Sequence, residues 1–122
     1  MRRDVRAGYV GPARAGFPEP GDAFVALTAM HVGVLQLELS IPGAMSLKDK
    51  RRVVLSLKDR IAHGHNVSVA EVGALDEHRR CIMGIAMVSN DKRYVEGGLA
   101  KLVDFVKMNS SAVLLDYKID LM

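Results

Sequence analysis

Apolar and polar residues alternate along the segment that follows Met30. One set of alternate positions holds Gly33, Leu35, Leu37, Leu39 and Ile41, and the other holds Val32, Val34, Gln36, Glu38 and Ser40. A period of two residues is typical of a β-strand that buries one face. The segment therefore predicts a strand, and the following Pro-Gly pair predicts a turn.

The next segment changes to a helical period. At about 100° per residue, one arc of the helix collects the apolar residues Leu47, Val53, Val54, Leu57 and Ile61. Ser46 is a favourable N-cap, and Asp49 three residues later forms a shortened version of the capping box. The pattern predicts a helix from Ser46 to about Ala62 that stops near Gly64.

Two strands, a helix and a last strand follow. Residues 66 to about 75 and residues 79–89 have strand patterns, and the centre of the second is apolar on both faces. Residues 89–91 offer caps for a helix with the apolar stripe Val95, Leu99, Leu102, Val103 and Val106. In that helix, Gly97 and Gly98 each cost about 1 kcal/mol relative to alanine. Residues 112–121 predict a strand with these inward positions: Val113, Leu115, Tyr117, Ile119 and Leu121.

The predicted order is β-α-β-β-α-β. With right-handed crossovers, this order gives an α+β ferredoxin-like sandwich, in which two helices cover one face of a four-stranded antiparallel sheet. This domain spans residues 30–122. Residues 1–29 hold most of the prolines and no sustained periodicity, and are therefore expected to form a disordered extension.

Composition narrows the function classes. With 122 residues, 49% of them hydrophobic, the chain is long enough for a core without disulfides or metals, and its one cysteine suits a reducing compartment. No apolar run approaches the roughly 18 residues of a membrane span. We therefore expect a cytoplasmic protein with no membrane partner. A net charge of +3 favours nucleic acid mildly.

The first predicted helix carries cations at an unfavourable end. Lys48, Lys50, Arg51 and Arg52 fall in its first two turns, where unpaired N–H groups already make a helix electropositive, and Lys58 follows on the same face. These five cations form the candidate nucleic-acid-binding set. Lys50 is the exception, because its projection falls inside the apolar stripe. The alternative is a solvated helix face with local pairing to Asp49 and Asp59.

The open sheet face is predicted to be a poor RNA platform. No aromatic residue lies between Met30 and Ser89, although RNA-binding domains of this fold stack bases on strand aromatics. The outward residues of the first and last strands include carboxylates, which repel phosphate. Because the third strand is apolar on both sides, self-association is possible through Val34, Gln36, Ile82, Ala86 and Val88. A tolerated surface of small residues is the alternative.

Catalytic and metal-binding chemistry finds little support. His63 and His65 flank a glycine, but two such histidines are more often solvated than ligating. Cys81 lies in an apolar strand and is expected to be inert. No phosphate-binding or nucleophile motif of a known class occurs. We expect no enzyme activity, no cofactor and no metal.

Three segments together resemble a known family. Residues 46–51 (SLKDKR), 66–71 (NVSVAE) and 88–91 (VSND), with the opening at 32–35 (VGVL), are similar to the bacterial YlxP-like family of unknown function. The resemblance implies a ferredoxin-like fold, a cytoplasmic location and a role near RNA or the ribosome, and it supplies no catalytic residues. Residues 1–29 and the Gly64-His65 pair depart from the family pattern.

Two functions follow as hypotheses. The first is a non-enzymatic accessory factor that binds RNA or the ribosome through the basic helix face. The second is a homodimeric interaction or small-ligand regulatory module that uses the open sheet face. The two differ in their response to salt, because phosphate binding weakens steeply with ionic strength.

Overall fold

The computed structural model describes residues 29–108 and 111–122. The chain forms β1 (His31–Ser40), α2 (Leu47–Gly64), β2 (Ser68–Gly73), β3 (Arg80–Ser89), α3 (Lys92–Met108) and β4 (Val113–Leu121). The predicted order β-α-β-β-α-β is therefore confirmed. Apart from Ala29, the predicted N-terminal extension lies outside the described residues.

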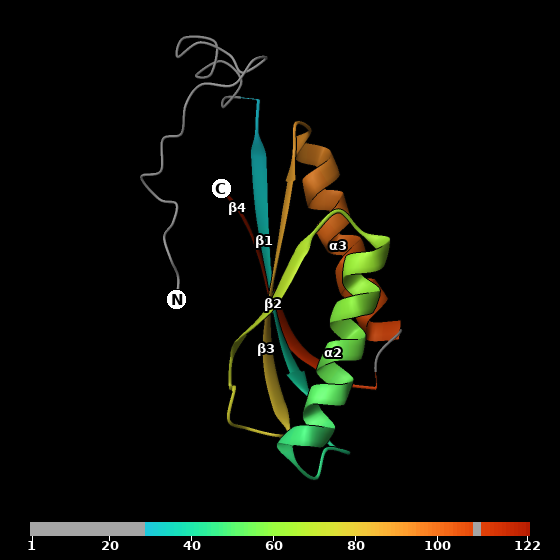
Figure 1. The fold of residues 1–122 in the computed structure, drawn as a ribbon. Coiled ribbons are helices and arrows are strands. Elements are labelled where there is room, and N and C mark those ends of the chain that lie inside the picture. The colour runs from blue at the N-terminus through green and yellow to red at the C-terminus, as the bar shows by residue number, and fades with distance from the viewer. Residues whose placement is uncertain (1–28, 109–110) are drawn as a thin grey trace, which may run out of the picture.

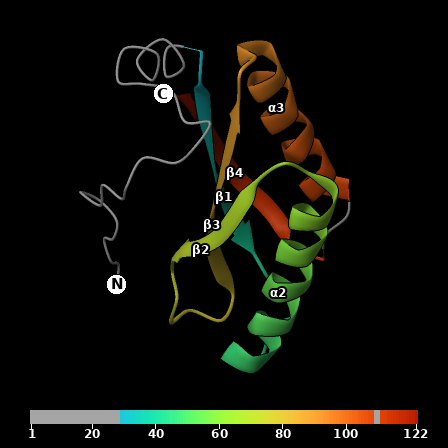
Figure 2. The same cartoon turned by 45° about the horizontal axis from the view of Figure 1, so that its top comes forward.

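The strands form one antiparallel sheet in the order β2-β3-β1-β4. Both helices lie on the same side of this sheet, as Figure 1 shows with the sheet seen edge-on and Figure 2 shows from a tilted view. Helix α2 packs on the edge strand β2, and α3 packs across β1, β3 and β4. This is the ferredoxin-like α+β arrangement predicted from the pattern. No helix of the described residues is long and apolar enough to cross a membrane.

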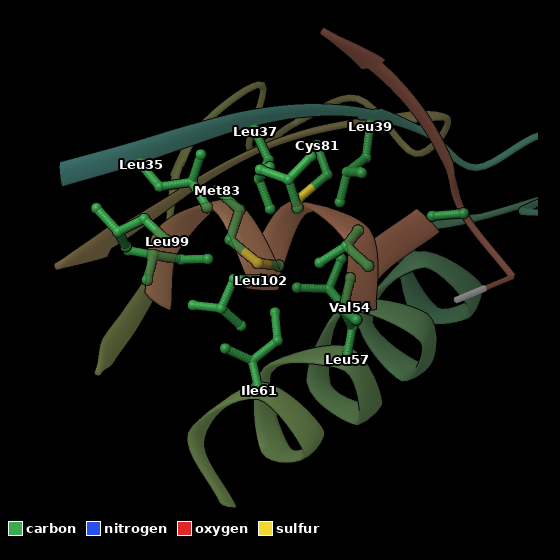
Figure 3. Close-up of a cluster of buried hydrophobic side chains, with 14 of the residues drawn as sticks. Leu35, Leu37, Leu39, Val54, Leu57, Ile61, Cys81, Met83, Leu99 and Leu102 are labelled. Carbon is green, nitrogen blue, oxygen red and sulfur yellow. The ribbon is translucent and has the colours of Figure 1, made fainter. Parts of the chain in front are cut away.

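The core lies between the sheet and the helices (Figure 3). Alternate residues of the two central strands point into it, among them Leu35, Leu37, Cys81 and Met83, which are all 0% exposed. These side chains pack against the apolar stripes of α2 and α3 that the helical period predicts. The period of two in the strands and the helical period in the helices thus identify the same core.

Gly33 is the point where α3 approaches β1 most closely. A Cβ atom at this position would lie 2.5 Å from Val95 Cγ1 and 2.7 Å from Leu99 Cδ1. Real Cβ contacts are never this short, so α3 could not pack at its present depth over a larger residue. Gly33 therefore sets how closely the N-terminal half of α3 packs on the sheet. This half of α3 also forms one wall of a cleft between the two helices.

The predicted inward face of β4 is wrong in its first half. Glu38 pairs with Asp116, but the next residue, Leu39, pairs with Leu114, so that Leu115 is an extra residue in a β-bulge. Beyond the bulge the faces exchange. Leu114 packs against the core, whereas Leu115 is 57% exposed, and Val113, which was also predicted inward, is 50% exposed.

The second half of β4 follows the prediction only in part. Ile119 and Leu121 pack against the core as expected. Tyr117 pairs with Leu37 on the inward side, yet it is 47% exposed because β4 is an edge strand. An alternating sequence pattern thus predicts on which face of the sheet a side chain lies, but not how much of that side chain the neighbouring elements bury.

Strand β2 is shorter than the pattern predicts. Before the strand begins, the Asn66 side-chain amide donates a hydrogen bond to the Val88 carbonyl oxygen at 3.1 Å. This side-chain contact takes the place of a backbone hydrogen bond between the strands. At its other end the register shifts between Glu71 and Gly73, and Ala74 has a φ of 57°. This left-handed conformation is unusual for a residue other than glycine. It turns the Ala74 carbonyl group toward α2, where Lys50 Nζ lies 2.7 Å from its oxygen.

Candidate functional site

The N-terminus of α2 is capped by its own polar side chains. Ser46 Oγ accepts a hydrogen bond from the backbone N–H of Asp49 at 3.1 Å, and Asp49 Oδ2 accepts one from the backbone N–H of Met45 at 2.9 Å. The N-cap predicted from the sequence is confirmed. Asp49 forms no ion pair within residues 29–108 and 111–122, so its carboxylate serves the cap and not the neighbouring cations.

The loop before α2 is tied to the connection between β2 and β3. The backbone N–H of Ile41 donates to the Arg79 carbonyl oxygen at 2.9 Å, and Arg79 Nε donates to the Ala44 carbonyl oxygen at 3.2 Å. These two hydrogen bonds join segments that are far apart in the sequence, and they fix the start of α2. The backbone that carries the cations of the first turns is therefore held in a fixed position.

Lys50 does not belong to the exposed cations. Its residue is only 2% exposed, and its Nζ lies 2.7 Å from Glu71 Oε2 in addition to the Ala74 carbonyl oxygen. Lys50 is buried because it lies on the apolar stripe of α2, as its position at about 100° per residue indicated. A buried ammonium group is stable only when it is paired and hydrogen-bonded. Lys50 joins α2 to the sheet, and we remove it from the candidate nucleic-acid-binding set.

Cys81 lies in the same buried region. Burial, together with the charge of Glu71, raises the pKa of its thiol to about 11, although the charges of Lys50 and Lys58 oppose this rise. At neutral pH a thiol with a raised pKa stays protonated, and a protonated thiol is a poor nucleophile. Cys81 contributes to the core rather than to a reactive site.

The other four candidate cations lie along the surface of α2. We call Lys48, Arg51, Arg52 and Lys58 the basic stripe. Their spacing of three, four and ten residues from Lys48 places them on adjoining faces of the helix. Lys48, Arg51 and Arg52 are exposed and Lys58 is half-buried. In the described part of the chain none of the four forms an ion pair.

A shallow groove runs between the basic stripe and the edge strand β2. Arg51, Leu55 and Lys58 form its helix side, Glu71 lies on its strand side, and its volume is about 210 Å³. Leu55 is 58% exposed, so an apolar side chain stands among the cations. The negative charge of Glu71 is directed at Lys50. The groove can therefore take a chain that carries both negative charges and flat apolar surface.

The residues of the predicted dimer interface all lie on the open face of the sheet. Val34 pairs with Ala86 and Gln36 with Gly84, and Ile82 and Val88 continue the same face of β3. Gln36, Ala86 and Val88 are exposed, whereas Val34 and Ile82 are half-buried. The structure thus brings these five residues together on one surface.

The rest of the open face carries charge of both signs. Arg80 Nε donates to Glu38 Oε2 at 2.8 Å, and this hydrogen bond and charge raise the pKa of the Arg80 guanidinium. Asp116 is the cross-strand partner of Glu38, which places two carboxylates opposite each other. These carboxylates disfavour a phosphate backbone on this face.

A cleft that the sequence did not predict lies between the end of α2 and the first turns of α3. Arg93, Tyr94 and Lys101 line it together with His63 and His65. Glu71 does not join these histidines, because it is paired with Lys50. Among the described residues, no group of three histidine, cysteine, aspartate or glutamate side chains gathers as a metal site would require. The signal that could have revealed the cleft is a glycine with a cation four residues on either side.

Comparison with known proteins places the chain in a family. Residues 32–119 match the model of a protein family of unknown function, DUF503. The uncharacterized protein YlxP of Bacillus subtilis is 35% identical over 75 residues, which cover 62% of this chain and 82% of YlxP. The match spans both helices and all four strands. The chain belongs to the DUF503 family, as its resemblance to YlxP-like proteins predicts.

Proposed function

We propose that this protein is a non-enzymatic accessory factor that binds RNA or the ribosome through the basic stripe of α2. The observation that carries the proposal is that the four cations of the stripe are without ion pairs within residues 29–108 and 111–122. A cation that is already paired must give up its partner to bind phosphate. The cations of the basic stripe are free of this cost.

The position of the charges supports the same conclusion. Cations at a helix N-terminus oppose the helix dipole, each by roughly a few tenths of a kcal/mol at an exposed site. Lys48 lies in the first turn of α2 and Arg51 and Arg52 in the second, and no ion pair within residues 29–108 and 111–122 offsets their charge. Lysine and arginine supply affinity for a phosphate backbone without reading the base sequence.

The surroundings of the stripe favour an extended nucleic acid over a single phosphate. The stripe covers about three turns of helix, or roughly 15 Å at 1.5 Å per residue. The neighbouring groove adds the exposed side chain of Leu55, against which a base or sugar can pack. The open sheet face carries the carboxylates Glu38 and Asp116, which makes it a less favourable surface for a nucleic acid than the basic stripe.

The test is a binding measurement on a charge-neutralised variant. Lys48→Gln, Arg51→Gln and Arg52→Gln together should abolish retention of the protein by ribosomes or by single-stranded RNA at low salt. The matched control removes three exposed cations elsewhere, with Lys92→Gln, Lys107→Gln and Lys118→Gln, and should retain most of the binding. Equal binding by the two variants would show that net charge, and not the stripe, is responsible.

A second copy of the chain is the alternative partner, and one observation favours it. Val32 pairs with Val88 and Val34 with Ala86, so the two central strands place an apolar quartet on the open face. Val88 is 47% exposed, and apolar surface at the centre of a sheet is typical of a face that another layer covers. Light scattering should then report a dimer that Ala86→Glu converts into a folded monomer. A monomeric parent protein at high micromolar concentration would exclude this alternative.

A further inference from the structure

The cleft between α2 and α3 has a volume of about 600 Å³. The last turn of α2 contributes His63, and the following residues contribute His65 and Asn66. Helices α2 and α3 run in opposite directions on the same side of the sheet (Figure 1), and the C-terminal end of α2 and the first half of α3 line the cleft together. The volume lies within the range of about 300–1,000 Å³ that small-molecule sites occupy.

One stripe of α3 forms the opposite wall. Arg93, Gly97 and Lys101 are four residues apart and therefore share a face of the helix. The two cations lie about 12 Å apart along the helix axis, at 1.5 Å per residue. The glycine between them leaves the backbone open. The result is a notch with a positive charge at each end.

The two glycines of α3 differ in what explains them. A Cβ atom at Gly98 would lie 2.8 Å from Cε of Met87, so a larger residue there would require the Met87 side chain to shift. A Cβ atom at Gly97 would have nothing within 4 Å. Glycine is unfavourable in the interior of a helix, and packing gives no reason for it at this position. The space over Gly97 is a feature of the cleft itself.

The wall on the α2 side is preformed. The ring of His65 makes an edge contact with Phe105, with the ring centres 5.2 Å apart, and its Nδ1 lies 2.9 Å from the Ile61 carbonyl oxygen. A carbonyl oxygen only accepts hydrogen bonds, so Nδ1 is the donor and carries a proton. Nε2 is then the ring nitrogen that remains for a ligand. The hydrogen bond from Asn66 to Val88 ties the next residue to the sheet.

The charge of the cleft has one sign. Arg93 and Lys101 line it, and no carboxylate of the described residues does. Glu96 precedes Gly97 in the sequence but does not line the cleft, and Asp91 caps α3, since its Oδ1 accepts from the backbone N–H groups of Arg93 and Tyr94 at 3.0 and 3.3 Å. Neither Arg93 nor Lys101 forms an ion pair within residues 29–108 and 111–122. The cleft therefore favours an anion.

We propose that this cleft binds a small phosphate-bearing molecule of the size of a mononucleotide. Arg93 and Lys101 hold the phosphate group with charge-assisted hydrogen bonds. The ring of Tyr94, which is 51% exposed, gives a flat surface on which a base can stack. The open backbone at Gly97 admits the sugar. None of these residues belongs to the basic stripe, so this site and the proposed function can fail separately.

Titration calorimetry of the full chain at low salt tests the proposal. The probes are the monophosphates of adenosine, guanosine, cytidine and uridine, with inorganic phosphate as the reference. At least one mononucleotide should bind saturably and about tenfold more tightly than inorganic phosphate, because stacking on an aromatic ring adds to the phosphate contacts. Arg93→Gln and Lys101→Gln should each weaken it about tenfold, which is a usual effect of losing one charge-assisted hydrogen bond. The matched control Lys107→Gln lies on the same helix outside the cleft and should bind as the parent does.

Gly97→Leu separates the cleft from the charge. Leucine is a good helix former, and its Cβ meets nothing at this position, so the variant should melt no lower than the parent. Its side chain fills the notch and should abolish mononucleotide binding with all cations intact. Failure of every mononucleotide and of phosphate to bind at millimolar concentration would overturn the proposal, as would binding by Gly97→Leu equal to that of the parent. If only single-stranded RNA responds to the Arg93 and Lys101 variants, the cleft is part of an RNA surface and the proposal is wrong.

Discussion

Among the described residues, cations without an ion pair lie near both ends of helix α2, but they line surfaces of different size. At the N-terminal end, the basic stripe stands on the outside of the helix beside a shallow groove of about 210 Å³. At the C-terminal end, Arg93 and Lys101 of α3 stand around a cleft of about 600 Å³. A row of cations along a helix matches an extended polyanion, and the larger hollow matches a ligand of the size of a mononucleotide. Shape, more than charge, separates the two expected partners.

Lys50 shows that position on the helix also separates roles. It is two residues from Lys48 and one from Arg51, yet it is buried and paired with Glu71 while its neighbours are exposed. The same residue type therefore serves the fold at one position and the surface at the next. This contrast gives the largest effect that we expect from a single substitution.

Lys50→Met should lower the free energy of unfolding by about 3 kcal/mol, because removal of one partner of a buried pair leaves the other uncompensated. Glu71 keeps 21% of its side-chain surface exposed, which places the loss at the lower end of such values. Urea unfolding measures the change. The control Lys48→Met removes an exposed lysine and should change the stability by less than about 0.5 kcal/mol.

A second substitution checks the cause of that loss. Combining Lys50→Met with Glu71→Gln removes the uncompensated carboxylate and should recover part of the lost stability. If the double variant is less stable than Lys50→Met alone, the ammonium group acts chiefly through the Ala74 carbonyl oxygen, 2.7 Å away. The pairing with Glu71 would then contribute little.

The fold could be predicted almost completely because each core element repeats one period. One local event escaped this reasoning, and a second was visible only in part. The bulge at Leu115 shifts β4 by one residue, and a shift of one residue exchanges the faces of a strand. The position of Lys50 on the apolar stripe was visible in the sequence, but the oxygen site that Glu71 and Ala74 form for its ammonium group was not. That site is formed across the turn after β2, which no local pattern shows.

The candidate sites were less predictable than the fold. The basic stripe was visible because its members lie on one helix, within a short stretch of sequence. The cleft was not, because its two walls come from segments about 30 residues apart, from His63 to Arg93. Tertiary structure brings them together. Only the glycine between two cations on α3 gave a local sign of it.

The next largest expected effect is the dependence of RNA binding by the basic stripe on salt concentration. Contact of three or four cations of the basic stripe with single-stranded RNA gives a log–log salt slope of roughly −2 to −3, at about 0.7 per phosphate. Between 50 and 200 mM salt, RNA affinity should then fall by roughly 15- to 60-fold. Filter binding at several salt concentrations measures this slope. A nearly flat slope would show that the stripe does not contact the phosphates.

Gly97→Ala should raise the free energy of unfolding by about 1 kcal/mol, which is the usual difference between glycine and alanine inside a helix. The added Cβ meets nothing within 4 Å, so no steric cost opposes the gain. Thermal or urea unfolding measures it. Gly98→Ala is the matched control, because its Cβ meets the Met87 side chain and should cancel part or all of the gain. An unchanged stability for Gly97→Ala would remove the argument that this glycine is retained for the cleft.

The smallest expected effect concerns the direction of the helix dipole. Lys48 lies in the first turn of α2, where a cation is unfavourable, and Lys107 lies in the last turn of α3, where a cation is favourable. Lys48→Glu should therefore raise the free energy of unfolding by about 0.5 kcal/mol, and Lys107→Glu should lower it by about the same amount. Urea unfolding at low salt can resolve this difference of sign, and 1 M salt should remove it, because the Debye length is then only about 3 Å. A cation that destabilises its own helix and whose loss also weakens RNA binding is retained for the partner. If Lys48→Glu instead lowers the stability, Lys48 supports the fold, and the argument that it is retained for RNA binding becomes weaker.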